Sequence, residues 1–349
     1  MPGDYMMADV TNNAPRRAFS TSTTLSIAGG AALFALVVWQ VGPAEIRDGF
    51  ERLGWGIALV VALGGLRFAT RAAAWVACLD RAHRLPFASA FGAVVAGDTL
   101  GNATPLGPVV GEPAKVAYVR HQVPPAAAFT ALAIENLLYS LSAAAMIAAG
   151  MVALLFRFEL PPALREFSET AIAIIGIAFV ASAVVLWQRP ALLSRWLPLA
   201  GRAGGKLRSH TERVQTLESD IYTFASRRPG AVMLAVTCEA VFHALGVLEA
   251  FLTIWLLTDV QPTLLMAFIM ETAQRFMAVA FKFVPFQIGV GEAGTAAFTR
   301  VLGLGDALGL NFALARKARM TVWAAIGALL LIRHGITARS VLAAKDTSP

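Results

Sequence analysis

The chain has 349 residues, of which 57% are hydrophobic and only 15% are charged, and its mean hydropathy is +0.64. A soluble domain is nearer half apolar and a quarter charged, so the composition excludes an ordinary soluble protein. Apolar runs long enough to cross a bilayer recur, which predicts an all-α, polytopic helical membrane protein. The net charge of +7 fits cytoplasmic loops beside lipid phosphates. No soluble basic domain is evident, so we expect no nucleic-acid partner.

The sequence also offers little for catalysis or cofactor binding. Cys78 and Cys238 both lie inside apolar runs, which is typical of small buried side chains rather than of a disulfide or metal framework. The Gly-rich passages lack the G-x-x-x-x-G-K-[ST] phosphate loop, and no Ser/His/Asp set stands out. We therefore expect no cofactor, no metal and no enzymatic activity.

In chain order, we predict a cytoplasmic N-terminal tail (1–24), a first membrane half (25–188) and a basic cytoplasmic linker (189–228). A second membrane half (229–335) and a cytoplasmic C-terminal tail (336–349) follow. Full spans are expected near 25–41, 55–79, 126–156, 170–187, 231–257 and 307–332. Two further regions, 86–122 and 262–305, are interrupted by Gly and Pro. We predict that each of these is a re-entrant helical hairpin.

A repeated motif supports this prediction. The stretch Pro105–Arg120 recurs as Pro285–Arg300, and the matched positions, all 180 residues apart, include Val110/Val290, Gly111/Gly291, Glu112/Glu292 and Arg120/Arg300. In a bilayer, backbone leaves helical geometry only where protein or a wet cavity covers it. Two matched breaks in two halves are typical of a transport site. The alternative is a pair of ordinary interfacial loops in an Ala- and Gly-rich chain.

The distribution of Lys and Arg predicts the orientation. Short loops rich in these residues stay on the cytoplasmic side. Arg81 and Arg84, the linker 189–228 and both tails are basic, so both termini are expected in the cytoplasm. If the hairpins do not cross, the six complete spans leave both termini on the same side, and we expect the two halves to have inverted topology. This parity changes if one hairpin crosses completely.

Charged residues inside the predicted spans are candidates for a substrate-binding cavity. A charge at mid-bilayer costs at least about 2.5–3.5 kcal/mol, so it should face the bundle interior and have a partner. Arginine suits a phosphate headgroup because its planar fork donates two hydrogen bonds. The carboxylates would hold those arginines or meet an amine of the substrate. The alternative for each residue is an interhelical ion pair that only stabilises the fold. The candidates are Arg67, Arg71, Glu112, Glu135, Arg275, Glu292 and Arg316.

Three stretches carry a resemblance to a known family. They are the Asn-x-x-Pro-x5-Gly-Glu element of Asn102–Glu112, the run Ala133–Leu137 and the second Pro-x5-Gly-Glu element. In this order they resemble the membrane region of lysylphosphatidylglycerol synthase, over roughly residues 25–335. The resemblance implies movement of a polar lipid between leaflets. The synthases carry a soluble aminoacyl-transferase domain after this region, and since this chain stops at Pro349 we do not expect synthase activity.

These observations lead to three hypotheses. The first is a flippase or transporter that moves a polar, anionic membrane lipid between leaflets of the bacterial inner (plasma) membrane without ATP. The second is an accessory membrane scaffold that binds a lipid-pathway enzyme through the basic linker. The third is a membrane-embedded lipid transferase that uses Glu112 or Glu292 as a base.

Overall fold

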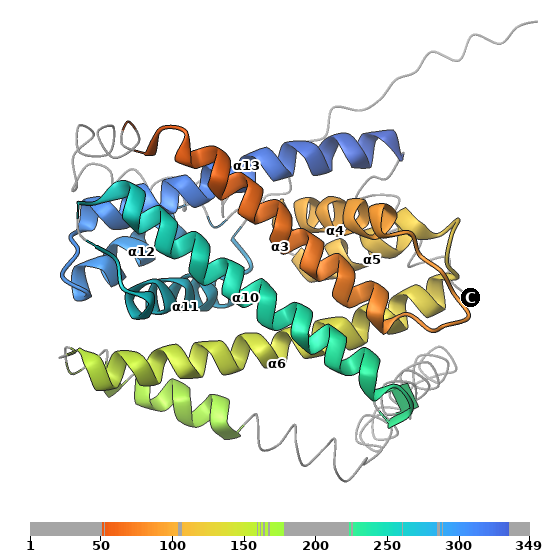
Figure 1. Ribbon diagram of the computed structural model, residues 1–349, viewed down its shortest axis with the longest axis horizontal. Helices are drawn as coiled ribbons and strands as arrows, with labels where there is room; N and C mark the ends of the chain where they lie inside the picture. Colours follow the sequence, from red (N-terminus) through yellow and green to blue (C-terminus); the bar gives the residue numbers. More distant parts are fainter. Residues whose placement is uncertain are drawn as a thin grey trace, which may run out of the picture.

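The computed structural model is built from helices (Figure 1). It describes residues 51–334 apart from 52, 104–106, 159, 161, 163–164, 167, 178–222, 225, 260, 285–286 and 288. No strand occurs in these ranges. The predicted first span, residues 178–187 of the predicted fourth span, most of the basic linker, both tails and the repeat prolines Pro105 and Pro285 lie outside the described residues.

The main helices follow the predicted order. They are α3 (Gly56–Cys78), α4 (Phe87–Asn102), α5 (Gly107–Val119), α6 (Pro125–Arg157), α10 (Pro229–Leu257), α11 (Leu264–Ala280), α12 (Val290–Val301) and α13 (Asp306–Arg333). Each interrupted region contains a pair of short helices, as the Gly and Pro residues predicted. Proline at the first turn starts α6 and α10, where its missing N–H has no partner to lose. The Thr263 hydroxyl caps α11 by accepting the N–H of Met266.

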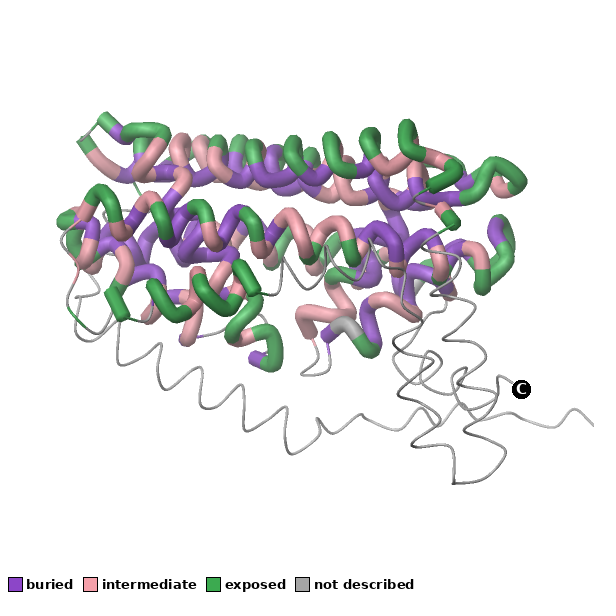
Figure 2. Tube along the Cα trace, turned by 90° about the horizontal axis from the view of Figure 1, so that it is seen from below, coloured by how far each residue is buried: buried purple, intermediate pink, exposed green. Residues whose placement is uncertain are grey.

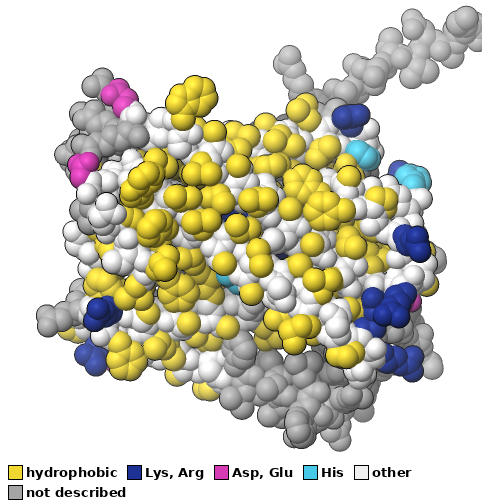
Figure 3. Space-filling view, viewed as in Figure 1, with side chains coloured by type: hydrophobic (Ala, Val, Ile, Leu, Met, Phe, Trp, Pro, Cys, Tyr) yellow, Lys and Arg dark blue, Asp and Glu magenta, His cyan; other side chains and the backbone are white. Residues whose placement is uncertain are grey.

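Three of these helices, α3, α6 and α10, are long and apolar enough to cross a membrane. They have 23, 33 and 29 residues. Large apolar side chains are exposed on the outer surface, including Leu66 at 53% and Met233 at 67%. Figure 3 shows hydrophobic side chains over most of one face, with Lys and Arg at its edges. A soluble monomer rarely exposes so much apolar surface, so this is a membrane protein whose outer face contacts lipid.

The helices form two successive sets of four with the same pattern of lengths. The first set, α3 to α6, has 23, 16, 13 and 33 residues, and the second, α10 to α13, has 29, 17, 12 and 28. In Figure 1 the colours show that α3 and α10 run in opposite directions, as do α6 and α13. The corresponding long helices of the two sets are therefore antiparallel.

The two sets interlock instead of standing side by side. The helices α3 and α10 pack against each other. The short helix α4 packs against α13 of the other set, and α11 packs against α6 in the matching way. The first short helix of each pair thus packs on the long last helix of the opposite set, whereas α5 packs on α6 and α12 on α13 within their own sets. Buried residues lie on the inward sides of these helices and exposed residues on the outward sides (Figure 2).

Glycine allows the close packing of α4 against α5. A Cβ on Gly97 would lie 2.8 Å from the carbonyl oxygen of Gly111, and one on Gly101 would lie 3.2 Å from that of Gly107. Small residues let helices approach closely in a membrane, where no hydrophobic driving force between helices exists. Gly111, which the repeat singled out, is therefore needed for the packing of this hairpin.

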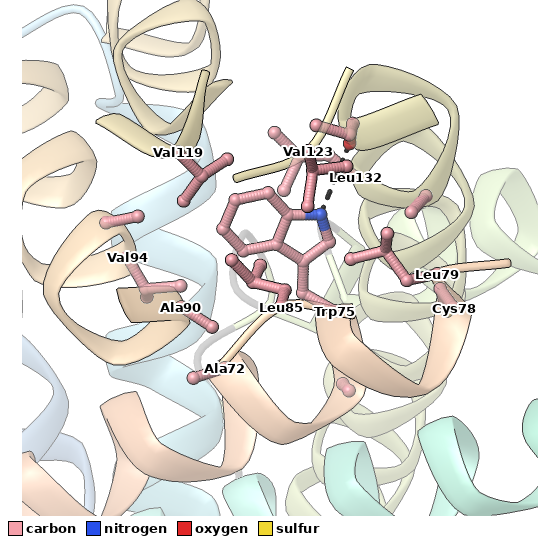
Figure 4. Packing of buried hydrophobic residues seen from close by; sticks show 14 of the residues in the cluster. Ala72, Trp75, Cys78, Leu79, Leu85, Ala90, Val94, Val119, Val123 and Leu132 are labelled. Atoms are coloured by element: carbon pink, nitrogen blue, oxygen red, sulfur yellow. Dashed lines mark hydrogen bonds between the residues drawn. The ribbon is translucent and has the colours of Figure 1, made fainter. Parts of the chain in front are cut away.

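Trp75 is the largest side chain in the core of the first set. It is fully buried, packs among Ala90, Val94 and Val119, and its indole Nε1 donates a hydrogen bond to the carbonyl oxygen of Ala128 at 3.2 Å (Figure 4). The indole thereby joins α3 to α4, α5 and α6.

We expect Trp75→Ala to lower the free energy of unfolding by about 3–5 kcal/mol, because the cavity left behind cannot collapse. Trp55→Ala is the matched control, since Trp55 is 93% exposed, and it should change stability by less than about 0.5 kcal/mol. Denaturant titration of the purified protein in mixed micelles measures both. Equal effects of the two substitutions would contradict this view of the core.

A cationic cavity as the candidate functional site

A cavity of about 300 Å³ lies at the centre of the bundle, and all of the main helices contribute to its lining. Its wall carries eight basic side chains: Arg67, Arg71, Lys115, Arg275, Lys282, Arg316, Lys317 and Arg319. Three carboxyl side chains also line it: Asp98, Glu112 and Glu292. Because the basic groups outnumber the acidic ones at its wall, the cavity suits an anion.

Glu271 of α11 is the centre of the larger charge network. It is fully buried, and it accepts hydrogen bonds from Arg67 at 3.0 Å, Arg275 at 2.6 Å and Arg316 at 2.8 Å. These arginines come from α3, α11 and α13. A single carboxylate thus holds both sets of helices together through charge-assisted hydrogen bonds, which are stronger than neutral ones.

A second carboxylate extends this network. Glu249 of α10 accepts a hydrogen bond from Arg67 at 3.0 Å and forms an ion pair with Arg319 at 3.1 Å. Both Glu249 and Glu271 lie behind the arginines, outside the cavity lining. The four arginines therefore present their guanidinium groups to the cavity with only two carboxylates at their back. This arrangement leaves an excess of positive charge at the wall.

Aromatic rings support the guanidinium groups. The ring of Phe242 lies 4.5 Å from the guanidinium of Arg67 and 4.9 Å from that of Arg275. The ring of Tyr139 lies 3.9 Å from the guanidinium of Arg71, and its hydroxyl accepts a hydrogen bond from Arg275 at 3.0 Å. Stacking orders these side chains without neutralising them, so their charge stays available to a ligand.

A smaller network joins α3, α6 and α5. Arg71 forms an ion pair with Glu135 at 2.5 Å and donates a hydrogen bond to the Asn136 side chain at 3.2 Å. Asn136 in turn donates to Glu112 at 3.0 Å, and Glu112 accepts two hydrogen bonds from Lys115. The carboxylate of the first repeat motif is thus connected to the arginine of α3.

The carboxylate of the second repeat motif has a similar position. Glu292 lies in the first turn of α12, where it accepts the backbone N–H of Gly289 at 2.8 Å and pairs with Lys317 of α13. Gly289 has a φ of +82°, a conformation that favours glycine. Both repeat carboxylates, Glu112 and Glu292, therefore line the cavity with a lysine as partner.

The structure brings the predicted site residues together. Six of the seven line the same cavity: Arg67, Arg71, Glu112, Arg275, Glu292 and Arg316. The seventh, Glu135, is 1% exposed and lies directly behind Arg71. That these residues bind a substrate stays a prediction. The alternative of interhelical ion pairs also describes their contacts, since most of them have a partner of opposite charge.

Several residues of the site were not among the candidates. Glu271 lies four residues before Arg275, and Arg319 lies three residues after Arg316, so helical spacing placed each beside a candidate. Lys115 was not selected because a lysine can equally reach the membrane surface. Lys317 lies beside the candidate Arg316 and was not selected either. In the part of the chain that the structure describes, no group of three His, Cys, Asp or Glu residues is arranged to hold a metal ion.

The comparison with known families agrees with this architecture. The model of the lysylphosphatidylglycerol synthase TM region matches residues 23–327. The chain belongs to this family. The matched range of the lysylphosphatidylglycerol synthase TM family includes every cavity-lining residue, and membership indicates a role connected with membrane lipids. The chain has no significant match among curated proteins or among solved structures.

We expect Glu271→Gln to destabilise the protein by about 3–5 kcal/mol, because removing one partner of a buried ion pair leaves the others uncompensated. Glu169→Gln is the control, since the Glu169 side chain is 57% exposed in its pair with Arg165, and should cost less than about 1 kcal/mol. The measurement is again denaturant titration in mixed micelles. A Glu271→Gln protein as stable as the parent would show that the three arginines do not depend on this carboxylate.

Proposed function

We propose that the protein is a flippase or transporter that moves a polar, anionic lipid between the leaflets of the bacterial inner membrane. The observation that carries this proposal is the cavity itself, an arginine-rich chamber inside a bundle whose outer surface is apolar. Planar guanidinium forks match a phosphate group in geometry and charge. A lipid headgroup would enter the chamber while its acyl chains stay in the bilayer.

The ends of the helices support an orientation for this transport. The ends of α3, α5 and α13 and the starts of α6 and α10 lie at the right of Figure 1. Basic residues next to these ends include Arg81, Arg120, Arg228 and Arg333. Acidic residues such as Asp259 and Asp306 lie in or beside the loops of the opposite end. By the positive-inside rule, the right-hand end is cytoplasmic in our proposal.

The short helices support the re-entrant prediction. At 1.5 Å per residue, the 16 residues of α4 and the 13 of α5 extend about 24 Å and 20 Å, which is less than the roughly 30 Å hydrocarbon core. The helices α11 and α12, with 17 and 12 residues, are similarly short. We infer that the two hairpins enter from opposite sides and meet at the cavity. Together with the antiparallel long helices, this corresponds to inverted-topology halves.

In this mechanism the two halves rock around the cavity and expose it to one side at a time, with no chemical change of the lipid. The buried ion pairs within the second half, among α10, α11 and α13, keep their arginines in place in both states. The hairpins, which have short helices and glycine contacts, are the elements that open and close access.

The lipid-transport role of the arginines is tested with the full chain in vesicles of phosphatidylglycerol containing a trace of a fluorescent phosphatidylglycerol. Headgroup movement is followed by quenching from outside. We expect Arg67→Gln/Arg275→Gln to lower the initial rate at least ten-fold, because both cations line the cavity and would contact the phosphate.

The matched control removes the same charge elsewhere. Arg165→Gln/Arg300→Gln replaces two arginines outside the cavity lining whose side chains are 68% and 65% exposed, and it should keep at least half of the parent rate. Equal rates for the parent and the cavity double mutant would reject the role assigned to Arg67 and Arg275. Lack of movement by the parent chain itself would reject the flippase proposal.

The topology is tested separately with single cysteines at the matched repeat positions Arg120 and Arg300, in a Cys78→Ala/Cys238→Ala background. Both arginines are exposed and each follows a hairpin. We expect a membrane-impermeant thiol reagent to label Arg120→Cys only from the cytoplasmic side and Arg300→Cys only from the outside. Labelling of both from one side would contradict the inverted arrangement.

A further inference from the structure

Among the residues that the structure describes, one buried carboxyl group has no basic partner of its own. Glu239 of α10 is 1% exposed, and within the described parts of the chain neither of its carboxyl oxygens receives a hydrogen bond. The equally buried Glu249, Glu271 and Glu292 each pair with an arginine or a lysine. A buried charge without a partner is strongly unfavourable, so Glu239 needs another means of compensation.

The neighbouring carboxyl group of Glu135 can compensate the buried charge of Glu239 by sharing a proton with it. Glu239 and Glu135 each lie one helical turn before a pair of contacting side chains, His243 of α10 and Tyr139 of α6, whose rings stack with their centroids 6.4 Å apart. The two buried carboxyl groups therefore face each other across the contact between α10 and α6, and Glu135 Oε1, like both oxygens of Glu239, receives no hydrogen bond in the described parts of the chain.

The charged and titratable groups that face Glu239 from the packed helices are Arg71 and Cys78 of α3, Glu135 of α6 and Arg275 of α11. Arg275 already donates to Glu271 and Tyr139, which leaves Arg71 as the one cation shared by two acids. Two carboxylates have no donor between them, so a hydrogen bond joining them requires a proton.

We propose that Glu135 and Glu239 form a proton-binding site, which controls how firmly Arg71 is held and thereby couples proton binding to anion binding in the cavity. The step is a simple protonation: one proton adds to a carboxyl oxygen of the pair, and no other bond forms or breaks. The proton site follows from the contacts of Glu239, whereas its coupling to lipid movement rests on the proposed function.

The contacts of Arg71 explain the coupling. It lines the cavity, and it pairs with Glu135 on the opposite side. When the pair has lost its proton, two negative charges hold the guanidinium. When the pair is protonated, only one does, and Arg71 can donate to a phosphate in the cavity. Protonation therefore favours anion binding, and by linkage anion binding favours protonation to the same degree. One proton would accompany each lipid anion.

The connection continues to the first hairpin. Arg71 also donates to Asn136, which donates to the repeat carboxylate Glu112 on α5. A shift of Arg71 toward a bound headgroup would change its hydrogen bond with Asn136 and, through it, the contact that holds α5 to α6. Protonation of Glu135 and Glu239 would in this way change the packing of α5, which belongs to the hairpin that we propose opens and closes the cavity.

The proton site is tested without any transport, by infrared spectroscopy of the purified full chain at neutral pH. We expect the carbonyl stretch of a protonated carboxyl group in the parent protein, lost in Glu239→Gln. Glu169→Gln is the control and should retain the band, because the Glu169 side chain is exposed in its pair with Arg165 and its replacement costs little stability. If Glu239→Gln does not fold, Glu135→Gln serves in its place. Absence of the band in the parent, or its persistence in Glu239→Gln, would overturn the proposal.

The coupling is tested in the phosphatidylglycerol vesicles described above. Above the titration point of the pair, we expect the parent rate to fall by about ten-fold for each unit of rising pH, as a single-proton equilibrium requires, and the rate of Glu239→Gln to change less than two-fold. The same pH dependence in both proteins would overturn the coupling while leaving lipid movement intact. A parent that shows the infrared band but moves no lipid would instead reject the proposed function and retain the proton site.

Discussion

The structure depends on the compensation of charge inside a membrane protein. Glu271 accepts hydrogen bonds from three arginines that come from α3, α11 and α13, and this single carboxylate therefore connects the two sets of helices. In a low-dielectric interior such bonds are stronger than in water, and an unpaired charge is correspondingly unfavourable. The relative position of the two sets is thus determined at their centre, where the cavity lies, and the helix surfaces that face lipid are free to be apolar.

The positive charge of the cavity wall arises because the arginines outnumber the carboxylates that pair with them. Four arginines share Glu249 and Glu271, so the wall keeps an excess of positive charge, and the rings of Phe242 and Tyr139 hold the guanidinium groups without neutralising them. The excess favours an anionic ligand, and a lipid phosphate is the anion that a membrane supplies in quantity. On the opposite side of Arg71 the imbalance has the other sign, since Glu135 and Glu239 share one cation, and a proton is the simplest ligand that corrects it.

Much of this arrangement was predictable from local sequence. The spans at 55–79, 126–156 and 231–257 agree closely with α3, α6 and α10 because uninterrupted apolar runs have few alternatives in a bilayer. The breaks at Gly and Pro predicted the short helix pairs, and the rule that a buried charge needs a partner selected six residues that line one cavity. Which residues form ion pairs with one another was harder to predict. Glu249 and Arg319 lie 70 residues apart and on different helices, so no periodicity within one helix relates them.

The sequence by itself therefore determined the membrane class, the positions of the described spans, the repeated motif and the residue types available for a polar site. These properties depend on neighbours along the chain, namely the length of an apolar run, helical spacing and the conformational limits of Gly and Pro. Only the tertiary structure decided that α4 packs on α13 and α11 on α6, which arginine pairs with which carboxylate, and that Glu239 has no basic partner of its own in the described ranges. Such pairings arise from the packing of helices far apart in the chain, where geometry in three dimensions selects among many partners of the same charge.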